Sequence, residues 1–442
     1  MKKELYSNRR ALAILAAALM LMLGSLYSHY HLYPYFEELH LERMESIWGR
    51  LLSLSLLLLL LTQVALLLYL LLLYIRYREI KPVSNELLPK CTIVVPAYNE
   101  GKLVYSTLIS IAQSNYPKDK IEIIAVDDGS SDDTFQWIKK GAKELGERVK
   151  IFRLPSNQGK RRALYKGFQN GTGEVFVTID SDSIIKSNTL RNLVTPFVTD
   201  FKCGAVAGNV KVLNREAALI PRMLSVSFLF SFEFIRASQS SLGFVLCTPG
   251  ALSAYKREPL FKALPEWINQ NFCGKVATIG EDRAMTNLIL EQGYRVLFQR
   301  NATVLTKTPI TFNTLHKMFT RWGRSNVRES VKMAQFIFTN FRDGSKFPQR
   351  IIFINHIVKL LLAVPLTLLM FYFIITQPLL YIVSILSSAF LFSSIQMLFY
   401  AKRNNFLDSL WAYPYSIFYL FTLFWITPYS IFTVKNGGWL TR

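Results

Sequence analysis

The chain has 442 residues and a formal net charge of +21 at pH 7. Apolar residues make up 51% of it and charged residues only 18%, which excludes a wholly soluble protein and a single small domain. The positive charge suits an anionic lipid surface or anionic substrates. Because the charge is dispersed and the sequence carries no nucleic-acid recognition motif, we expect no nucleic-acid partner.

Two apolar runs come first, at residues 11–27 and 51–75. The second is longer than the roughly 20 residues that cross a bilayer. The first follows a basic start, so a secretory signal peptide is the alternative, but no small-residue cleavage site follows it. The loop between the runs is acidic and the residues just beyond the second are basic. The positive-inside rule therefore predicts that the N-terminus and the segment after residue 75 are cytosolic.

From residue 82 to about residue 200, short β-branched runs alternate with helical patterns. Strands are predicted at residues 92–95, 121–126, 149–153 and 175–179, and helices at residues 103–114, 133–145 and 161–168. This alternation predicts a parallel α/β sheet. In such sheets ligands bind beyond the carboxyl ends of the strands.

A polar cluster follows each of the four predicted strands. The clusters are Pro-Ala-Tyr-Asn-Glu at 96–100, Asp-Asp-Gly-Ser at 127–130, Asn-Gln-Gly-Lys at 157–160 and Asp-Ser-Asp at 180–182. No GxGxxG motif follows the first strand, which argues against a redox Rossmann domain. We therefore expect an acidic and aromatic ligand site at this edge of the sheet.

Two pairs of carboxylates in this soluble part point to chemistry. Asp180 and Asp182 have the spacing of a site for a divalent cation that also holds a diphosphate, although aspartate is also common in turns for its local hydrogen bonds. The other pair, Glu281 and Asp282, can supply a base. Asp128 either belongs to a segment that only caps a helix or accepts a hydrogen bond from a nucleotide base.

The second half of the chain returns to apolar segments. Residues 219–240 and 311–336 have the mixed composition of amphipathic helices that lie at a membrane interface or pack on the sheet. Apolar runs follow at residues 351–375, 379–400 and 406–434. Prolines interrupt the last run, which is either one kinked span or an interfacial helix with a re-entrant turn.

Read together and in order, these motifs resemble the processive family 2 glycosyltransferases, which have a GT-A fold, and most closely the hyaluronan synthases, followed by the rhizobial chitooligosaccharide synthases. The matching pieces are VDDGSSDDT, NQGKRRAL, DSDS, GNVKVLNR, FIRASQSS, TPGALSAYKR, INQNFCGKVATIGEDR, RWGRSNVRES and the terminal WLTR. The resemblance implies a plasma-membrane enzyme that polymerises UDP-activated sugars in the cytosol and secretes the polysaccharide. UDP-GlcNAc is the favoured donor, alternating with UDP-GlcA if the product is hyaluronan.

The family pattern divides the chain into five parts. These are two N-terminal transmembrane helices (1–81), a cytosolic α/β GT-A catalytic domain (82–310), amphipathic interface helices (311–348), C-terminal transmembrane or re-entrant segments (349–434) and a gating tail (435–442). In the tail, Trp439 and Arg442 would close over UDP from the cytosolic side. This arrangement favours a re-entrant last segment that returns to the cytosol.

The resemblance also implies the residues of the donor site. The substrate pocket would be formed by Pro96, Tyr98, Glu100, Asp127 and Asp128. Lys160 would reach the diphosphate or the sugar. Asp180 and Asp182 would hold Mg²⁺ or Mn²⁺ together with the UDP phosphates.

On the acceptor side, the resemblance makes Asp282 the general base, with Glu281 and Arg283 beside it. An inverting transfer needs one carboxylate opposite the leaving group to receive the acceptor's proton, and Arg283 can keep that carboxylate ionised. Two arginines, Arg257 and Arg321, would bind phosphate, and Trp322 would stack on the acceptor sugar.

Two departures from the family pattern leave the product open. Met318 stands where the family has glutamine, and Thr248-Pro249-Gly250 replaces Ser-Gly-Pro. The alternatives are a chitooligosaccharide or poly-GlcNAc synthase, a non-processive transferase to polyprenyl phosphate, and a membrane scaffold without catalysis. The intact carboxylates argue against the scaffold.

Overall fold

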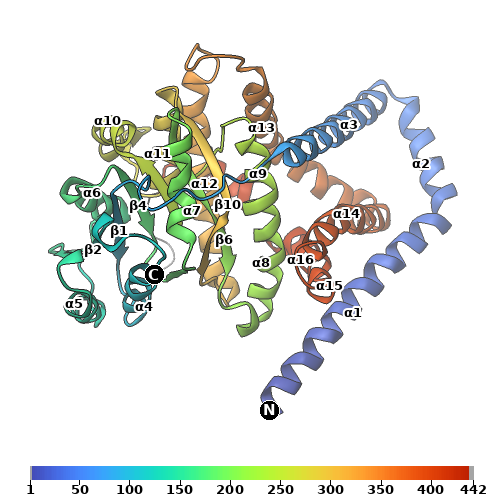
Figure 1. Cartoon of the computed structure of the whole chain (residues 1–442). Helices are drawn as coiled ribbons and strands as arrows, with labels where there is room; N and C mark the ends of the chain where they lie inside the picture. The colour runs from blue at the N-terminus through green and yellow to red at the C-terminus, as the bar shows by residue number, and fades with distance from the viewer. Residues whose placement is uncertain (1, 438–442) are drawn as a thin grey trace.

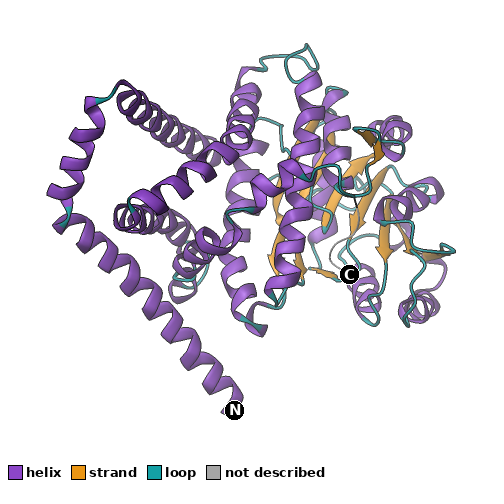
Figure 2. Cartoon of the chain, turned by 180° about the vertical axis from the view of Figure 1, so that it is seen from behind, coloured by secondary structure: helices purple, strands orange, loops and turns teal. Residues whose placement is uncertain are grey.

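An eight-stranded mixed sheet organises the middle of the chain, with strand order β3-β2-β1-β4-β7-β6-β10-β5. The computed structural model describes residues 2–437 (Figures 1 and 2). The strands are β1 (Cys91–Ala97), β2 (Ile121–Asp127), β3 (Val149–Arg153), β4 (Val175–Ile179), β5 (Ser183–Ile185), β6 (Cys203–Val212), β7 (Leu252–Lys256) and β10 (Arg295–Thr306). The four predicted strands are present and parallel, and β7 and β5 add antiparallel pairings.

Helices cover both faces of the sheet, as the buried, β-branched strands require. They are α4 (Leu103–Ala112), α5 (Thr134–Leu145), α6 (Lys160–Asn170), α7 (Thr189–Thr199), α10 (Arg257–Ile268) and α11 (Glu281–Glu291), and a small hairpin of β8 (Asn271–Phe272) and β9 (Lys275–Val276) precedes α11. Gly167 lets α6 lie directly on β1, because a Cβ there would stand 2.3 Å from Val94 Cγ1. This close contact fixes the start of α6 at the carboxyl edge of the sheet.

The two segments predicted as amphipathic are helical. The first consists of α8 (Leu219–Leu229), the π-helical turn η4 (Phe230–Ile235) and α9 (Arg236–Ser240), and the second is α12 (Phe312–Phe336). Both pack against the sheet or its helices on one side and membrane-type helices on the other: α8 contacts β6 and α16, and α12 contacts α11 and α17. They form the layer between the α/β lobe and the apolar helices.

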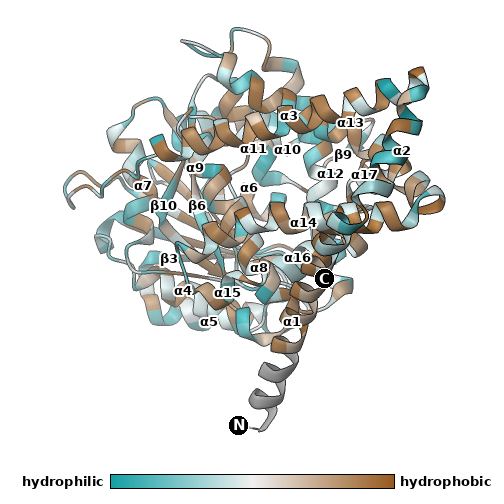
Figure 3. Cartoon of the chain, turned by 90° about the vertical axis from the view of Figure 1, so that its right-hand side faces the viewer, coloured by the Kyte–Doolittle hydropathy of each residue, from teal (hydrophilic) through white to brown (hydrophobic). Residues whose placement is uncertain are grey.

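Five described segments are long and apolar enough to cross a membrane, by length and composition. Four are the helices α1 (Lys2–His31), α3 (Ile47–Arg76), α13 (Phe347–Thr376) and α14 (Pro378–Ala401), with α2 (Tyr33–Glu45) joining α1 to α3. Figure 3 shows that α3 and the coloured part of α1 are mainly hydrophobic. In Figure 1 the arch of α1, α2 and α3 stands to one side of the sheet.

The fifth segment, Phe406–Phe432, is a broken helical run. It consists of α15 (Phe406–Ser409), α16 (Ala412–Phe418), the π-helical turn η5 (Tyr419–Leu423) and α17 (Ile426–Phe432). Pro414 and Pro428 are each the third residue of their helix, where a missing N–H breaks no helical hydrogen bond.

Both ends of this run lie against the α/β lobe. Asp408 at its start forms an ion pair with Arg215. Gly437, just after its end, packs beside Thr278, because a Cβ on Gly437 would lie 2.8 Å from the Thr278 hydroxyl. This placement favours a run that returns to the side from which it started.

A buried carboxylate ties the membrane-type helices to the lobe. Glu233 in η4 pairs with Arg300 of β10 and with Arg403, just after α14, each at 3.1 Å. The end of α3 joins the same cluster, because the Arg300 guanidinium lies 4.8 Å from the centre of the Tyr77 ring. Three segments far apart in the chain therefore depend on one buried anion.

Replacing Glu233 with glutamine should destabilise the protein by about 3 kcal/mol, because two arginines lose their buried counter-charge. Thermal unfolding of the full chain in detergent measures this. The control is Asp343→Asn, whose ion pair with Lys202 is exposed (90% and 47% of the side chains) and should leave the melting temperature almost unchanged. Equal effects of the two substitutions would contradict the role given to Glu233.

Candidate active site

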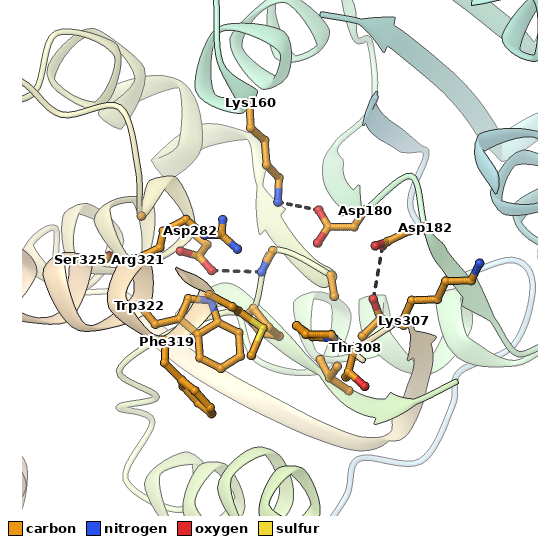
Figure 4. A pocket seen from close by; sticks show the side chains of 18 of the residues that line it. Lys160, Asp180, Asp182, Asp282, Lys307, Thr308, Phe319, Arg321, Trp322 and Ser325 are labelled. Atoms are coloured by element: carbon orange, nitrogen blue, oxygen red, sulfur yellow. Dashed lines mark hydrogen bonds and ion pairs between the residues drawn. The ribbon is translucent and has the colours of Figure 1, made fainter. Parts of the chain in front are cut away.

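A cavity of about 1000 Å³ opens at the carboxyl ends of the strands and extends to the membrane-type helices. Its wall includes twelve of the predicted residues: Pro96, Tyr98, Glu100, Asp128, Lys160, Asp180, Asp182, Glu281, Asp282, Arg283, Arg321 and Trp322. Figure 4 shows Lys160, Asp180 and Asp282 converging on one part of this cavity, with Asp182 beside them. The four polar clusters at the strand ends and the later acidic pair thus share one space.

Two predicted residues lie outside the cavity wall. Asp127 is fully buried, and its carboxylate pairs with Arg153 at 3.1 Å and accepts from the Ser130 amide at 3.3 Å. Arg257 is the first residue of α10, and its guanidinium donates to the carbonyls of Gly171 and Gly173. Both side chains contact other parts of the fold, and their predicted substrate contacts stay predictions.

Two further predicted residues, Trp439 and Arg442, fall outside the described residues. Their proposed place over the nucleotide stays a prediction.

Asp128 is built into the wall by the loop that precedes α6. Its two carboxylate oxygens accept from the amides of Gln158 (2.9 Å) and Gly159 (2.8 Å). Gly159 has φ +90°, a conformation that only glycine adopts readily. Burial raises the pKa of Asp128, although these two hydrogen bonds oppose the shift. Asp128 therefore orders the turn that presents Lys160.

Lys160 is the cation at the centre of the acidic residues. Its ammonium pairs with Asp180 at 2.5 Å and with Glu281 at 3.2 Å. Burial alone would lower the pKa of Lys160, but the two carboxylates raise it above its ordinary value. Burial likewise acts to raise the pKa of Glu281, but Lys160 and Arg321 lower it. Lys160 and Glu281 therefore stay charged at neutral pH.

Asp282 is placed by the start of α11. Gly280 precedes the helix with φ +73°, and a Cβ there would lie 1.9 Å from the Ser325 hydroxyl, so a side chain at this position would displace α12. Acidic residues in a first helical turn are stabilised by the helix dipole. The carboxylate of Asp282 accepts from the Gly250 amide at 3.1 Å and from the Arg283 amide at 2.7 Å.

Gly250 lies where the two acidic pairs meet. A Cβ on it would stand 2.6 Å from Lys160 Nζ, 3.7 Å from an Asp282 oxygen and 3.8 Å from an Asp180 oxygen. The Thr-Pro-Gly turn that departs from the family pattern thus supplies the gap in which these groups converge.

Arg283 contacts Asp282 through its backbone, and its predicted role in keeping that carboxylate ionised stays a prediction. Its guanidinium points to His356 of α13 at 3.3 Å, and only its backbone amide reaches the carboxylate. Burial and the neighbouring Glu281 raise the pKa of Asp282, and Lys160 opposes them. A carboxylate with a raised pKa is a better proton acceptor near neutral pH.

Asp180 and Asp182 suit a divalent cation. Burial and the charge of Asp180 raise the pKa of Asp182 to about 6, and a bound cation would relieve both effects. The Thr306 hydroxyl donates to Asp182 at 3.3 Å and orients the carboxylate. Among the described residues no cluster has three or more histidine, cysteine or acidic ligands, so phosphate oxygens would have to complete the coordination.

The half of the cavity nearer the membrane-type helices is aromatic. Trp322 lies against Phe228 and Phe319, with ring centroids 6.1 and 5.6 Å apart, and Phe232 and Met318 share this wall. Trp322 and Phe319 are labelled in Figure 4. The wall continues with residues of the broken run, namely Tyr419, Leu423, Ile426 and Thr427.

Sequence reasoning missed most of this second half. Arg236 also lies in the wall, with its guanidinium 4.0 Å from the centre of the Phe232 ring and its Nε donating to the Cys247 carbonyl. The only sequence feature that pointed to Arg236 was the family resemblance of the segment FIRASQSS, which assigned no role to this residue. The aromatic residues come from separate helices whose packing no local pattern predicts.

Comparison with known proteins agrees with this geometry. Residues 92–262 match the model of the family "Glycosyl transferase family 2". The chain is 30% identical over 358 residues to the hyaluronan synthase of Streptococcus pyogenes, covering 80% of this chain and 83% of that protein. It is also 30% identical over 250 residues to an N-acetylglucosaminyltransferase of Rhizobium sp. (strain N33), covering 56% of this chain and 55% of that protein.

Among solved structures, the chain resembles the mannosyltransferase PcManGT from Pyrobaculum calidifontis in complex with GDP-Man and Mn²⁺. The TM-score is 0.52 at 20% identity, covering 82% of this chain and 97% of that chain. The chain belongs to glycosyl transferase family 2, has a GT-A-like fold with a Rossmann-like core, and is a glycosyltransferase.

Asp182→Asn should stabilise the metal-free protein at pH 7.5 by on the order of 1–2 kcal/mol. The pKa of Asp182 is raised from 3.8 to about 6 in the folded state, so the penalty for ionising the buried carboxylate builds up between these two pH values. It is complete above pH 6 and absent below the ordinary pKa. The gain should therefore disappear on acidification. Thermal unfolding at several pH values measures it.

The same experiment with added Mn²⁺ separates the effect of Asp182 on stability from its predicted role as a cation ligand. Mn²⁺ should raise the melting temperature of the wild type and have little effect on Asp182→Asn. The exposed Asp119→Asn is the control and should behave as the wild type in both series. A variant that responds to Mn²⁺ like the wild type would remove Asp182 from the cation site.

Proposed function

We propose that this glycosyltransferase is a membrane-embedded, inverting polysaccharide synthase that polymerises UDP-activated sugars and secretes the product. The observation that carries the proposal is the single cavity that joins an acidic donor half at the sheet edge to an aromatic half bounded by the broken apolar run. The lobe would face the cytosol of a multi-pass plasma-membrane protein. The names of the two relatives support a sugar polymer containing GlcNAc.

In the donor half, Pro96, Tyr98, Glu100 and Asp128 would hold the uridine, and Lys160 would reach the diphosphate or the sugar. Asp180 and Asp182 would hold Mg²⁺ or Mn²⁺, which neutralises the charge of the departing diphosphate. Arg321, on the wall close enough to lower the pKa of Glu281, would bind phosphate. A diphosphate that replaces Asp180 on Lys160 would keep the ammonium paired.

In the transfer step, an acceptor hydroxyl attacks the anomeric carbon from the face opposite UDP. The new carbon–oxygen bond forms as the bond to the diphosphate breaks, UDP leaves with the electron pair, and the hydroxyl proton passes to Asp282. The raised pKa of Asp282 suits this role. Glu281 would hold Lys160 in place, and Trp322 would stack on the acceptor sugar.

The acceptor wall favours an alternating polymer with an acidic sugar. Met318 offers no amide to a sugar hydroxyl, and Arg236 places a positive charge among the aromatic rings. A guanidinium beside a stacking ring suits the carboxylate of a glucuronate unit. We therefore favour UDP-GlcNAc alternating with UDP-GlcA, as in hyaluronan, over a GlcNAc homopolymer.

Purified enzyme incubated with single and paired UDP-sugars tests the product. A polymer that needs both sugars and is degraded by hyaluronidase is the expected result. A chitinase-sensitive polymer from UDP-GlcNAc alone would indicate the homopolymer. A lipid-extractable product would indicate transfer to polyprenyl phosphate, and absence of UDP release with every donor would contradict catalysis.

Asp282→Asn should lower polymer formation by 10²–10⁴-fold, because the acceptor proton loses its base. UDP affinity should change by less than about threefold, since asparagine keeps the size of the side chain and an oxygen for the Gly250 amide. UDP release and calorimetric titration with UDP measure the two quantities. More than a tenth of wild-type synthesis would exclude Asp282 as the base, whereas parallel loss of UDP binding would indicate a folding defect.

A further inference from the structure

A second cavity, of about 300 Å³, shares no lining residue with the first. One side is formed by the end of α3 and the residues after it, namely Leu73, Arg76, Tyr77, Arg78 and Ile80. The other side comes from the lobe, where α9 and β10 meet the end of α3 (Figure 1). The cavity therefore lies between a membrane-type helix and the α/β lobe.

The cavity lies at the depth where lipid headgroups would be. The apolar run of α3 ends at Arg76, which is its last helical residue. Leu68, Leu72 and Ile75 form a stripe at helical spacing that stops just before this arginine, and each is more than half exposed (57%, 60% and 57%). An acyl chain lying along this stripe would bring its headgroup to the cavity.

Positive charge exceeds negative charge around the cavity. Arg76, Arg78 and Arg295 line it, against one acid, Asp200, which pairs with Arg295 at 3.0 Å. Arg342 stands behind the wall and donates to the carbonyls of Leu242 and Gly243 at 2.9 and 3.1 Å. Burial and the charge of Arg295 both lower the pKa of Arg342, which is the effect of cations gathered with too few anions.

The two arginines of α3 are placed to bind an anion. Arg78 uses one nitrogen to donate to the carbonyls of Ile75 and Tyr77 at the end of the helix, at 2.6 and 3.0 Å. This holds the guanidinium at the cavity, and its other N–H groups can meet a ligand. Arg76 precedes it by two residues and is exposed, so the oxygens of one phosphate group can accept from both planar guanidinium groups.

We propose that this cavity binds the phosphate headgroup of an anionic phospholipid, with Arg76 and Arg78 on the phosphate and the acyl chains along α3. Free phosphate offers the same chemistry to the arginines. The apolar stripe that leads to the cavity favours the lipid, because only a lipid gains from covering it.

Titration of the full chain in neutral detergent, followed by native mass spectrometry, tests the site. The probes are dioctanoyl phosphatidylglycerol, dioctanoyl phosphatidylcholine and inorganic phosphate. The anionic lipid should bind most tightly, and Arg76→Gln/Arg78→Gln should weaken it roughly thirtyfold. The control Lys118→Gln/Lys143→Gln removes the same charge from exposed positions of the lobe and should change affinity less than twofold.

Equal binding of the anionic and zwitterionic lipids would overturn the proposal, and so would an unchanged affinity in the double arginine variant. Displacement of the lipid by phosphate at equal concentration would also overturn it, because that result indicates a site for free anions. If the double variant does not fold, the single Arg76→Gln variant replaces it, with a loss of roughly fivefold expected. An unchanged affinity in that variant would also overturn the assignment.

Discussion

The ammonium of Lys160, held between Asp180 and Glu281, is the interaction on which the rest of the site depends. Six carboxylates line one cavity, and four of them, Asp180, Asp182, Glu281 and Asp282, lie near Lys160. Without an internal cation the mutual repulsion of these four would force them apart or neutralise them. Lys160 reaches from α6 to the end of β4 and the start of α11, so it also fixes the distance between these elements. Gly250 leaves the space for this contact, which explains why the turn before β7 carries no side chain there.

The sequence predicted the acidic half of the cavity better than the aromatic half, for a physical reason. Buried strands and the polar residues at their ends are local features, and parallel strands bring those ends to one edge. The antiparallel placement of β7 and β5, and the aromatic wall around Trp322, depend on contacts between distant segments. Motif matching also did not predict the contacts that Asp127 and Arg257 make with other parts of the fold.

Polar and charged residues join the α/β lobe to the apolar helices at two places, around Glu233 and at the end of α3. Glu233 gathers arginines from β10 and from the end of α14, while the end of α3 brings its own arginines to a separate cavity. A purely apolar interface would allow the lobe to shift along the apolar helices, because dispersion and the burial of apolar surface have little directional preference. Charged pairs with defined geometry fix the position of the sheet edge relative to the apolar helices, and with it the alignment of the acidic and aromatic halves of the cavity.

The broken run at the end of the chain has a consequence for anyone who isolates the lobe. Tyr419, Leu423 and Ile426 close the aromatic end of the large cavity, although they lie far in sequence from the strands that form the other end. A fragment that lacks α1 to α3 and ends before α13 would retain the acidic edge of the sheet and lose the aromatic end of the cavity. Such a fragment could still bind a sugar donor, but it would lack the aromatic wall against which an acceptor chain could bind.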